Sequence, residues 1–171
     1  KVVASSVAVS LPNSIETLSG VTGVRRMFLI ANSFLLTSEI LQQIRFGWKL
    51  DYVQISNGML STDGLRIVSS LNARAIAIQG WLKASVDEPT ETPITAMSLD
   101  LDVQGMSSDD LCELTKSASC TDLRMPPIVI TPKVLRCLQH LRLHCLDVSR
   151  VLRVVNNDVV VRANVLIIRK S

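Results

Sequence analysis

Hydrophobic and polar residues alternate along two central stretches of the chain. In residues 76–86, Ile76 and Ile78 alternate with polar positions such as Gln79, and residues 97–104 alternate in the same way. A period of two places one set of side chains on a buried face and the other set in solvent. The polar stretch 87–93 lies between them, so we expect two half-buried strands joined by an exposed loop.

Further stretches also predict strands. Residues 3–11 end at Pro12, and residues 24–36 are almost continuously apolar, as in a buried strand. Asn57-Gly58 indicates a turn. Near the end of the chain, residues 148–155 and 159–168 flank a polar Asn-Asn-Asp sequence, which predicts a β-hairpin.

Helices are predicted at four places. Residues 38–50 carry an apolar stripe after a capping Thr37 or Ser38, and residues 62–71 form a shorter helical pattern. Ser107 and Asp110 have the spacing of a capping box. Thr131 followed by Pro132 marks the start of another helix. The predicted apolar stripe of that last helix contains Val134, Leu135, Leu138, Leu141 and Cys145, and its predicted opposite face contains Lys133, Arg136, His140 and His144.

Together these elements predict an α+β fold with an antiparallel β-sheet, helices packed against it, and a C-terminal helix and β-hairpin. We recognise no internal repeat. The 171 residues suit a single domain, which a boundary near Arg124 could divide into a larger lobe, 1–123, and a smaller lobe, 124–171.

Composition narrows the class of protein. Hydrophobic residues make up 47% of the chain, charged residues 19% and aromatic residues 4%. These values exclude a disordered chain and an aromatic-rich platform for single-stranded nucleic acid. The longest charge-free stretches, 2–15 and 27–38, are shorter than the roughly 20 apolar residues of a membrane helix. We expect Trp48 and Trp81 to be core residues.

Charge is unevenly distributed along the chain although the net charge is only +3. Residues 1–86 carry +4, residues 87–123 carry −8 and residues 124–171 carry +7. A scatter of solvated charges and a bipolar molecule both fit this pattern. In the bipolar alternative, the acidic segment of one subunit contacts the basic segment of the next, head to tail and in a salt-sensitive way.

Two sets of residues follow from the bipolar alternative. The basic set would bind an anionic partner, either ribonucleoprotein or lipid, and comprises Arg136, Arg142, Arg150, Arg153, Arg162, Arg169 and Lys170. The acidic set would mediate self-association and comprises Asp87, Glu88, Glu91, Asp109 and Asp110.

Catalytic signatures are few. Asp100 and Asp102 share a strand face and could hold Mg²⁺, but no local motif places a third ligand near them, and a solvated strand face is the simpler explanation. On the predicted last helix, Cys137, His140 and His144 would face one way and could bind Zn²⁺ with Cys112 or Cys120 as a fourth ligand. The alternative is a free thiol beside two surface histidines. With no recognisable signal peptide, the four cysteines are expected to be reduced thiols.

Four segments follow one another in a recognisable order along the chain. Met27-Phe-Leu-Ile-Ala-Asn32 leads into Thr37-Ser-Glu-Ile-Leu41, and Trp48-Lys-Leu-Asp-Tyr52 follows them. After these come residues 75–84 and 94–105, and then residues 124–132 with Pro126, Pro127 and Pro132. This order resembles that of the matrix proteins of rhabdoviruses, in particular of plant-infecting members: a strand before the first long helix, the end of that helix, the paired central strands, and the Pro-rich entry to the C-terminal part.

Two features depart from the family's pattern. The loop 87–93 carries three carboxylates where animal-virus relatives have an apolar loop, and Pro126-Pro127-Ile128-Val129 lacks the Tyr of a Pro-Pro-x-Tyr motif. The resemblance implies a structural protein with no enzymatic activity, cofactor, metal or small-molecule substrate. It would self-associate, condense viral nucleoprotein–RNA and link it to an anionic membrane surface, in the virion beneath the envelope and in the host cytoplasm. The alternatives are another viral coat or movement protein, a small metal-dependent hydrolase, or a cellular adaptor.

Overall fold

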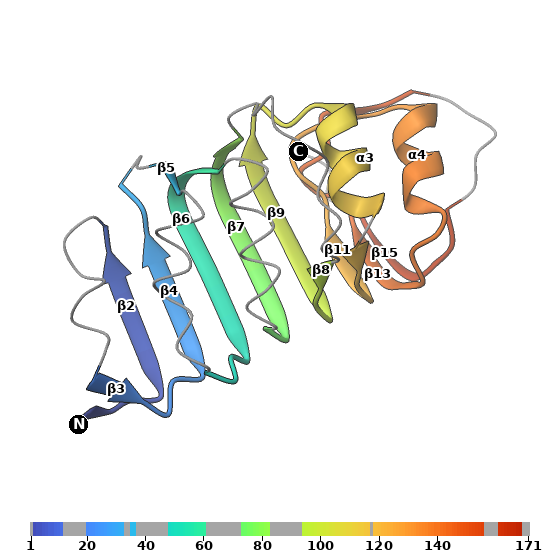
Figure 1. The fold of residues 1–171 in the computed structure, drawn as a ribbon. Coiled ribbons are helices and arrows are strands. Elements are labelled where there is room, and N and C mark those ends of the chain that lie inside the picture. The colour runs from blue at the N-terminus through green and yellow to red at the C-terminus, as the bar shows by residue number, and fades with distance from the viewer. Residues whose placement is uncertain are drawn as a thin grey trace.

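The computed structural model describes residues 2–11, 20–32, 35–36, 48–60, 73–82, 94–116, 118–155 and 161–168. Within them, eight strands form one continuous parallel sheet, in which each strand lies beside the strands that precede and follow it in this series (Figure 1). These strands are β2 (Ser6–Ser10), β4 (Arg26–Ile30), β6 (Tyr52–Leu60), β7 (Ala75–Leu82), β9 (Ser98–Gln104), β11 (Asp122–Arg124), β13 (Leu143–Asp147) and β15 (Ala163–Ile167).

Short strands complete the described secondary structure. Parallel pairs form between β1 (Val2–Val3) and β3 (Val21–Thr22), between β8 (Ile94–Thr95) and β10 (Ala118–Ser119), and between β12 (Val129–Ile130) and β14 (Arg153–Val154). Strand β5 (Leu35–Leu36) pairs with β6. Helices α3 (Ser108–Lys116) and α4 (Pro132–Leu138) lie between successive strands of the sheet (Figure 1).

The sheet is built from a repeated unit. Residues in register across all eight strands recur every 20 to 26 positions, and one inward row consists of Val7, Met27, Val53, Ile76, Leu99, Leu123, Leu146 and Leu166. A backbone carbonyl just before the strand accepts N–H groups from the next repeat at several successive steps, as when the Met97 carbonyl accepts from both Thr121 and Asp122. The chain is therefore a solenoid, in which each repeat contacts mainly its neighbours.

The expected antiparallel sheet is wrong, because all the pairings of the eight main strands are parallel. Consecutive parallel strands need a crossover on one face of the sheet, so the fold is of the α/β kind and not α+β. The expected C-terminal hairpin is also wrong. Strand β14 pairs with β12 and β15 pairs with β13, each in parallel, so the two do not pair with each other. The expectation that the chain has no internal repeat is wrong too, because residues in register across the eight strands recur every 20 to 26 positions.

Several local predictions are confirmed. Strands β7 and β9 alternate as expected, and their inward side chains Ile76, Ile78, Leu99 and Leu101 are buried. The amide and hydroxyl groups of Ser107 both donate to Asp110, which starts α3 as a capping box. The side-chain oxygen of Thr131 accepts a hydrogen bond from the backbone N–H of Val134 and so caps α4. The predicted helices at 38–50 and 62–71 lie largely or wholly outside the described residues.

Other local predictions are wrong. The Asn57-Gly58 pair is not a turn but a bulge inside β6, with Asn57 at a φ of 54°. Gly80 of β7 passes so close to Gly58 that a Cβ on Gly80 would lie 2.1 Å from the Gly58 carbonyl oxygen. Trp81 is largely exposed, whereas Trp48 is partly buried against the core.

One core runs the length of the described sheet. Inward strand side chains pack with Leu111 and Leu114 of α3 and with Val134 and Leu138 of α4. These helices therefore cover the inward face, and no helix of the described residues packs on the other face, which we call the open face. The sheet continues across the supposed lobe boundary, since Leu123 and Arg124 both belong to β11 between β9 and β13. No helix in the described part of the chain is long and apolar enough to cross a bilayer.

A disulfide joins the two helices of successive repeats. Cys112 of α3 bonds to Cys137 of α4, whereas Cys120 and Cys145 are free thiols. The expectation of four reduced thiols is therefore wrong for one pair. The bond closes a loop between two cysteines that are 25 positions apart, which lowers the conformational entropy of the unfolded chain.

We predict that reducing this disulfide, or replacing both partners in C112A/C137A, lowers the free energy of unfolding by about 2–4 kcal/mol. Denaturant unfolding followed by circular dichroism measures the change. The matched control is C145S, which removes a free thiol and should leave the midpoint unchanged. Equal midpoints for the oxidised and reduced wild-type protein would contradict the assigned bond.

Candidate functional site on the open face of the sheet

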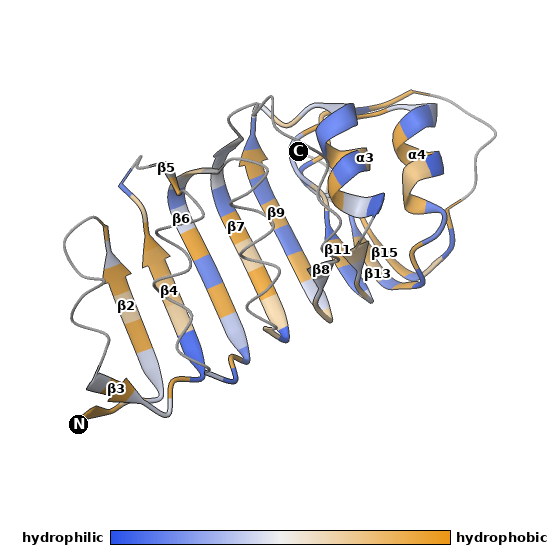
Figure 2. Ribbon diagram, viewed as in Figure 1, coloured by the Kyte–Doolittle hydropathy of each residue, from blue (hydrophilic) through white to orange (hydrophobic). Residues whose placement is uncertain are grey.

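The open face of the sheet carries small, polar and aromatic side chains in register. Bands of polar and apolar residues alternate along β6, β7 and β9 because successive side chains point to opposite faces (Figure 2). One outward row consists of Ala8, Phe28, Gln54, Ala77, Asp100, Arg124, Asp147 and Ile167. Most of these side chains are partly exposed, whereas the interior members of the inward rows are buried.

An ion-pair lattice occupies the C-terminal half of this row. Asp100, Arg124 and Asp147 are neighbours on β9, β11 and β13. Arg124 donates through Nε to Asp147 Oδ2 at 2.7 Å and through Nη1 to Asp100 Oδ2 at 3.1 Å. The planar guanidinium of Arg124 on β11 thus bonds to a carboxylate on each neighbouring strand. These bonds fix the positions of the three side chains relative to one another.

Arg150 extends the lattice from the segment after β13. Its guanidinium donates to Asp100 and lies 3.6 Å from Asp102 Oδ2 through Nη2. Arg150 is about three-quarters buried. Both carboxylates that the sequence suggested for Mg²⁺ are therefore neutralised by arginine, which lowers their attraction for a cation.

Asp147 is the most buried member of the lattice. Burial alone would raise the pKa of this carboxyl group, but hydrogen bonds from Ser149 and Arg124 outweigh burial and hold the pKa below its ordinary value of 3.8. In turn, the pKa of Arg124 is raised, chiefly by its hydrogen bond to Asp147. The pair is therefore ionised at neutral pH.

A hollow of about 220 Å³ opens beside the lattice. Its lining includes Ser98, Asp122 and Cys145, which are in register on β9, β11 and β13, and Ile167 of β15. The Oδ1 atom of Asp122 is buried and has no hydrogen-bond partner in the described structure. A buried carboxylate oxygen without a donor is energetically costly, which makes Asp122 an unusual member of this face.

Aromatic and amide side chains form the N-terminal half of the open face. The rings of Phe28 and Tyr52 lie 5.8 Å apart at 58°. The Tyr52 hydroxyl donates to Gln54 Oε1 at 3.1 Å, and the Gln54 amide donates to Ser56 and, at 3.4 Å, to Gln79. Burial and the charge of Asp100 raise the pKa of Tyr52, so its hydroxyl stays protonated. The open face thus combines an aromatic part, which has the exposed Arg26 at its edge in register with Tyr52, with a part rich in carboxylates.

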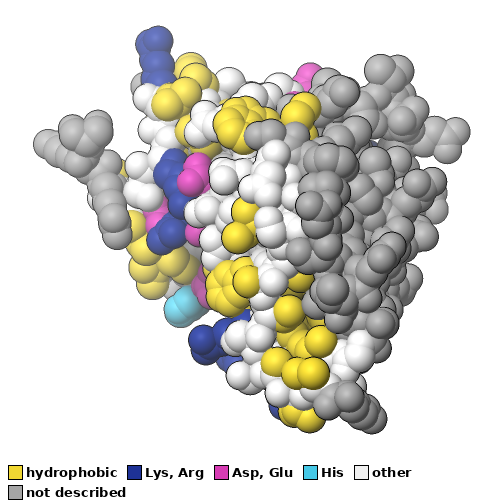
Figure 3. All heavy atoms as spheres, turned by 90° about the vertical axis from the view of Figure 1, so that its left-hand side faces the viewer, with side chains coloured by type: hydrophobic (Ala, Val, Ile, Leu, Met, Phe, Trp, Pro, Cys, Tyr) yellow, Lys and Arg dark blue, Asp and Glu magenta, His cyan; other side chains and the backbone are white. Residues whose placement is uncertain are grey.

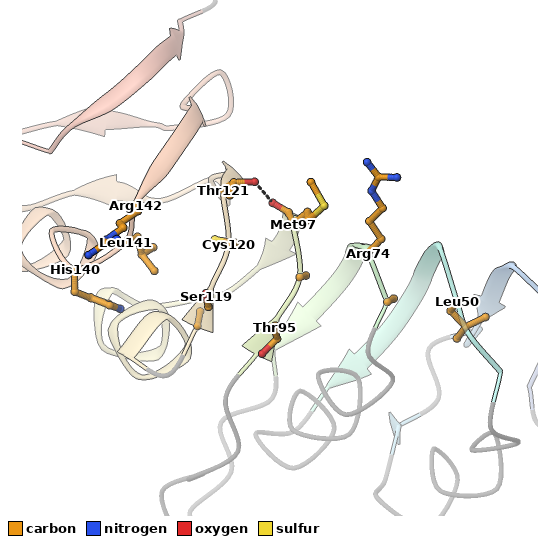
Figure 4. A pocket seen from close by; sticks show the side chains of 13 residues that line it. Leu50, Arg74, Thr95, Met97, Ser119, Cys120, Thr121, His140, Leu141 and Arg142 are labelled. Carbon is orange, nitrogen blue, oxygen red and sulfur yellow. Dashed lines mark hydrogen bonds between the residues drawn. The ribbon is translucent and has the colours of Figure 1, made fainter.

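A second and larger cavity, of about 760 Å³, lies at the ends where β7, β9 and β11 begin (Figure 4). Ala73, Ala96 and Ala118 are small residues that line it. Burial, with a contribution from Asp122, raises the pKa of the Cys120 thiol to about 11, so that it stays protonated. Arg74, one of the polar residues that line the cavity, points away from it in Figure 4.

The acidic residues proposed for self-association are only partly placed. Asp109 pairs with Lys133, which links α3 to α4, and Asp110 caps α3. Both therefore have partners within the same chain. Asp87, Glu88 and Glu91 lie outside the described residues.

The basic residues proposed for an anionic partner do not form one patch. Arg142 and Arg162 are exposed and in register just before β13 and β15, since Leu143 pairs with Ala163. Arg150 belongs to the ion-pair lattice. Arg136 is on α4 and Arg153 is on β14, away from the starts of β13 and β15. Arg169 and Lys170 lie outside the described residues.

The proposed zinc ligands are not brought together on one helix. Helix α4 ends at Leu138, so His140 follows it and His144 lies on β13, where Asn164 contacts it at 3.3 Å. Cys137 is bonded to Cys112, and His140 Nε2 lies 2.8 Å from the Thr115 carbonyl oxygen. Among the described residues, no three His, Cys, Asp or Glu side chains are grouped to hold a metal ion.

Sequence reasoning missed Arg124, Asp147 and Asp122 as members of one site. The sequence did contain a signal for this site. A pattern of three apolar residues, the second and third lying three and five positions after the first, recurs along the chain. Leu50, Val53 and Ile55 form one instance, and Ala96, Leu99 and Leu101 form another. Aligning these instances places Asp100, Arg124 and Asp147 at one position of the repeat.

Comparisons with known proteins add no relative. Neither a scan against protein-family models nor searches of curated proteins and of solved structures found a significant match to this chain.

We predict that D147N loses about 1–3 kcal/mol of unfolding free energy at pH 7, because the buried Asp147 carboxylate would no longer pair with the partly exposed Arg124 and would be a weaker acceptor for Ser149. Since the folded-state pKa is lowered, this contribution is complete above the ordinary value of 3.8 and is lost as the pH falls through the folded-state value. Urea unfolding from pH 7 to pH 3 measures the difference between D147N and wild type. The exposed pair offers the control D109N, for which we expect little change. A D147N penalty that stays constant over this pH range would refute the electrostatic account.

Proposed function

We propose that this chain is a binding protein that recognises a protein partner on the open face of its sheet. The observation that carries the proposal is the hollow beside the ion-pair lattice, which is lined by the carboxylates of Asp100, Asp122 and Asp147 and at which the buried Asp122 Oδ1 has no hydrogen-bond donor among the described residues. The repeat length and the spacing of its apolar residues are those of leucine-rich repeats, whose strands line an extended surface. Solenoids of this kind typically use such surfaces for binding.

Charge indicates the chemistry of the partner. Four carboxylates on the charged part of the face, those of Asp100, Asp102, Asp122 and Asp147, face two guanidinium groups. The balance is acidic by two charges. A basic or hydrogen-bond-donating side chain, flanked by apolar residues that contact Phe28 and Tyr52, would complement both parts of the face.

The other functions considered from the sequence stay hypotheses, and the described residues support them to different degrees. A self-associating matrix or coat protein needs surfaces for other molecules, which is compatible with a binding solenoid. A movement protein is not distinguished from these by the described residues. A metal-dependent hydrolase has less support, because Asp100, Asp102 and Cys137 are already engaged by arginines or a disulfide.

Selection of peptides from a random library against the folded chain tests the proposed face. We predict that the selected peptides are enriched in Lys and Arg, and that D122N weakens their binding about tenfold or more, since a charge-assisted hydrogen bond is lost. The matched control is E113Q, which removes one carboxylate from the exposed side of α3. Isothermal titration gives the affinities.

Selected peptides that bind D122N and wild type equally, or that lose affinity only in E113Q, would contradict the assignment of the open face. Circular dichroism of D122N excludes unfolding as the cause of a loss. Binding to the open face is also independent of the salt-sensitive contact between subunits considered from the sequence.

Binding of an anionic surface stays a separate hypothesis, and the structure changes its best test. Arg142 and Arg162 are neighbouring and exposed, whereas Arg150 is engaged in the lattice. We predict that R142E/R162E reduces co-sedimentation with phosphatidylserine vesicles at 50 mM salt, while R136E/R153E, which changes the same number of charges, reduces it less. Equal pelleting of both double variants and the wild type would remove support for the pair as an anion site.

A further inference from the structure

The side chain of Arg150 reaches from the segment after β13 back to strand β9. Its guanidinium donates through Nη1 to Asp100, which lies 50 positions earlier in the chain. Its Nη2 atom lies 3.6 Å from Asp102 Oδ2, which is longer than a hydrogen bond. The two carboxylates of β9 therefore already hold a guanidinium group, but only one of them accepts a hydrogen bond from it.

The backbone on both sides of Arg150 is held by bonds that do not involve its side chain. The N–H of Val148 donates to the Ile167 carbonyl at 3.0 Å, and the N–H of Leu152 donates to the Ile128 carbonyl at 3.0 Å. Since these bonds fix the segment before and after Arg150, its guanidinium can leave β9 while the backbone keeps its position. The side chain is thus a detachable part of the lattice.

The ion pairs of Arg150 are partly solvated, which weakens them. The side chains of Arg150 and Asp100 are each 26% exposed, and that of Asp102 is 32% exposed. Figure 3, which looks along the sheet from β2, shows both basic and acidic side chains at the surface on the side of the open face. Asp100 has a second partner in Arg124, whereas Asp102 has no other ion pair among the described residues. A cation that arrives from solvent can therefore reach these carboxylates.

The neighbours of Asp102 on β7 favour arginine over lysine. Gln79 is in register with Asp102, and Trp81 lies two positions further along β7. Because alternate residues of a strand share one face, Trp81 is on the open face, where it is 48% exposed. A planar guanidinium can stack on an indole ring while it bonds to a carboxylate, which an ammonium group does less well.

We propose that Asp100 and Asp102 form a subsite for a guanidinium group, which Arg150 fills in the free chain and an arginine of the protein partner fills in the complex. This inference rests on the proposed function, since the partner is the one that binds the open face. Arg150 is then an internal competitor, and it lowers the partner's affinity according to the fraction of molecules in which it occupies the subsite.

Titration of the full chain with ethylguanidinium, followed by NMR, tests the subsite without any peptide. Ethylguanidinium reproduces the Arg150 side chain beyond Cβ, so R150A should bind it with saturable shifts of the β9 amide signals. The wild type, whose subsite is filled, should bind it about fivefold more weakly or less. The matched control R153A removes the same charge from an exposed position of β14 and should behave like the wild type. Ethylammonium, which mimics lysine, should bind R150A about fivefold more weakly than ethylguanidinium does.

The peptides selected against the open face test the competition. We expect R150A to bind those that contain arginine about threefold to tenfold more tightly than the wild type or R153A does, because the internal competitor is removed. Replacing the arginine of the peptide with lysine should abolish this gain. Circular dichroism checks that the variants are folded, and R150S replaces R150A if that variant is not.

Two results would overturn the proposal. One is an R150A variant that shows no saturable binding of ethylguanidinium, or that binds ethylammonium equally well, because Asp100 and Asp102 would then not select a guanidinium group. The other is an affinity of R150A for the arginine peptides no higher than that of R153A, which would show that Arg150 does not compete. Failure of the proposed function differs from both, since no peptide would then bind the open face, whereas the ethylguanidinium titration would still decide whether the subsite exists.

Discussion

Stacking of aliphatic side chains between successive repeats is the constraint on which the rest of this structure depends. Each repeat contributes only two or three inward residues, such as Leu99 and Leu101 in β9, which cannot form a core alone. Burial at roughly 25 cal/mol per Å² makes the shared core the main stabilising contribution. The parallel direction of the strands, the position of α3 and α4 and the open face all follow from it.

The open face gains its properties from the same constraint. Because the ladder fixes the register of β9, β11 and β13, Asp100, Arg124 and Asp147 are neighbours although they are far apart in the sequence. A charged row on this face costs little, since it stays partly solvated and pairs within itself. Among the described residues, the lattice leaves one buried carboxylate oxygen, Asp122 Oδ1, without a hydrogen-bond donor.

Local signals in the sequence predicted local structure well. The capping residues of α3 and α4 and the alternation in β7 and β9 depend on neighbours within a few positions, and the structure confirms them. The pairing of strands depends on residues 20 to 26 positions apart, and alternation is the same in parallel and antiparallel sheets. The period-two pattern therefore located these strands correctly, whereas the predictions of an antiparallel sheet and of a C-terminal hairpin were wrong.

The candidate site could be predicted only in part for the same reason. Asp100 and Asp102 were recognised because they share one strand, but their arginine partners come from later repeats. The supposed helical cluster of Cys137, His140 and His144 assumed that α4 continued, whereas it ends at Leu138 and the chain enters β13. The Cys112–Cys137 bond joins two repeats and has no local signature.

Distances between spin labels on β7 and β9 test the parallel solenoid most directly. With Cys120 and Cys145 replaced by serine, labels at Trp81 and Ser98 should be separated by about 20 Å, six residues of strand at about 3.3 Å each. Labels at Trp81 and Gln104 should show the strong dipolar broadening of adjacent positions. The reverse result, with Trp81 adjacent to Ser98 and distant from Gln104, would establish an antiparallel pair and contradict the account.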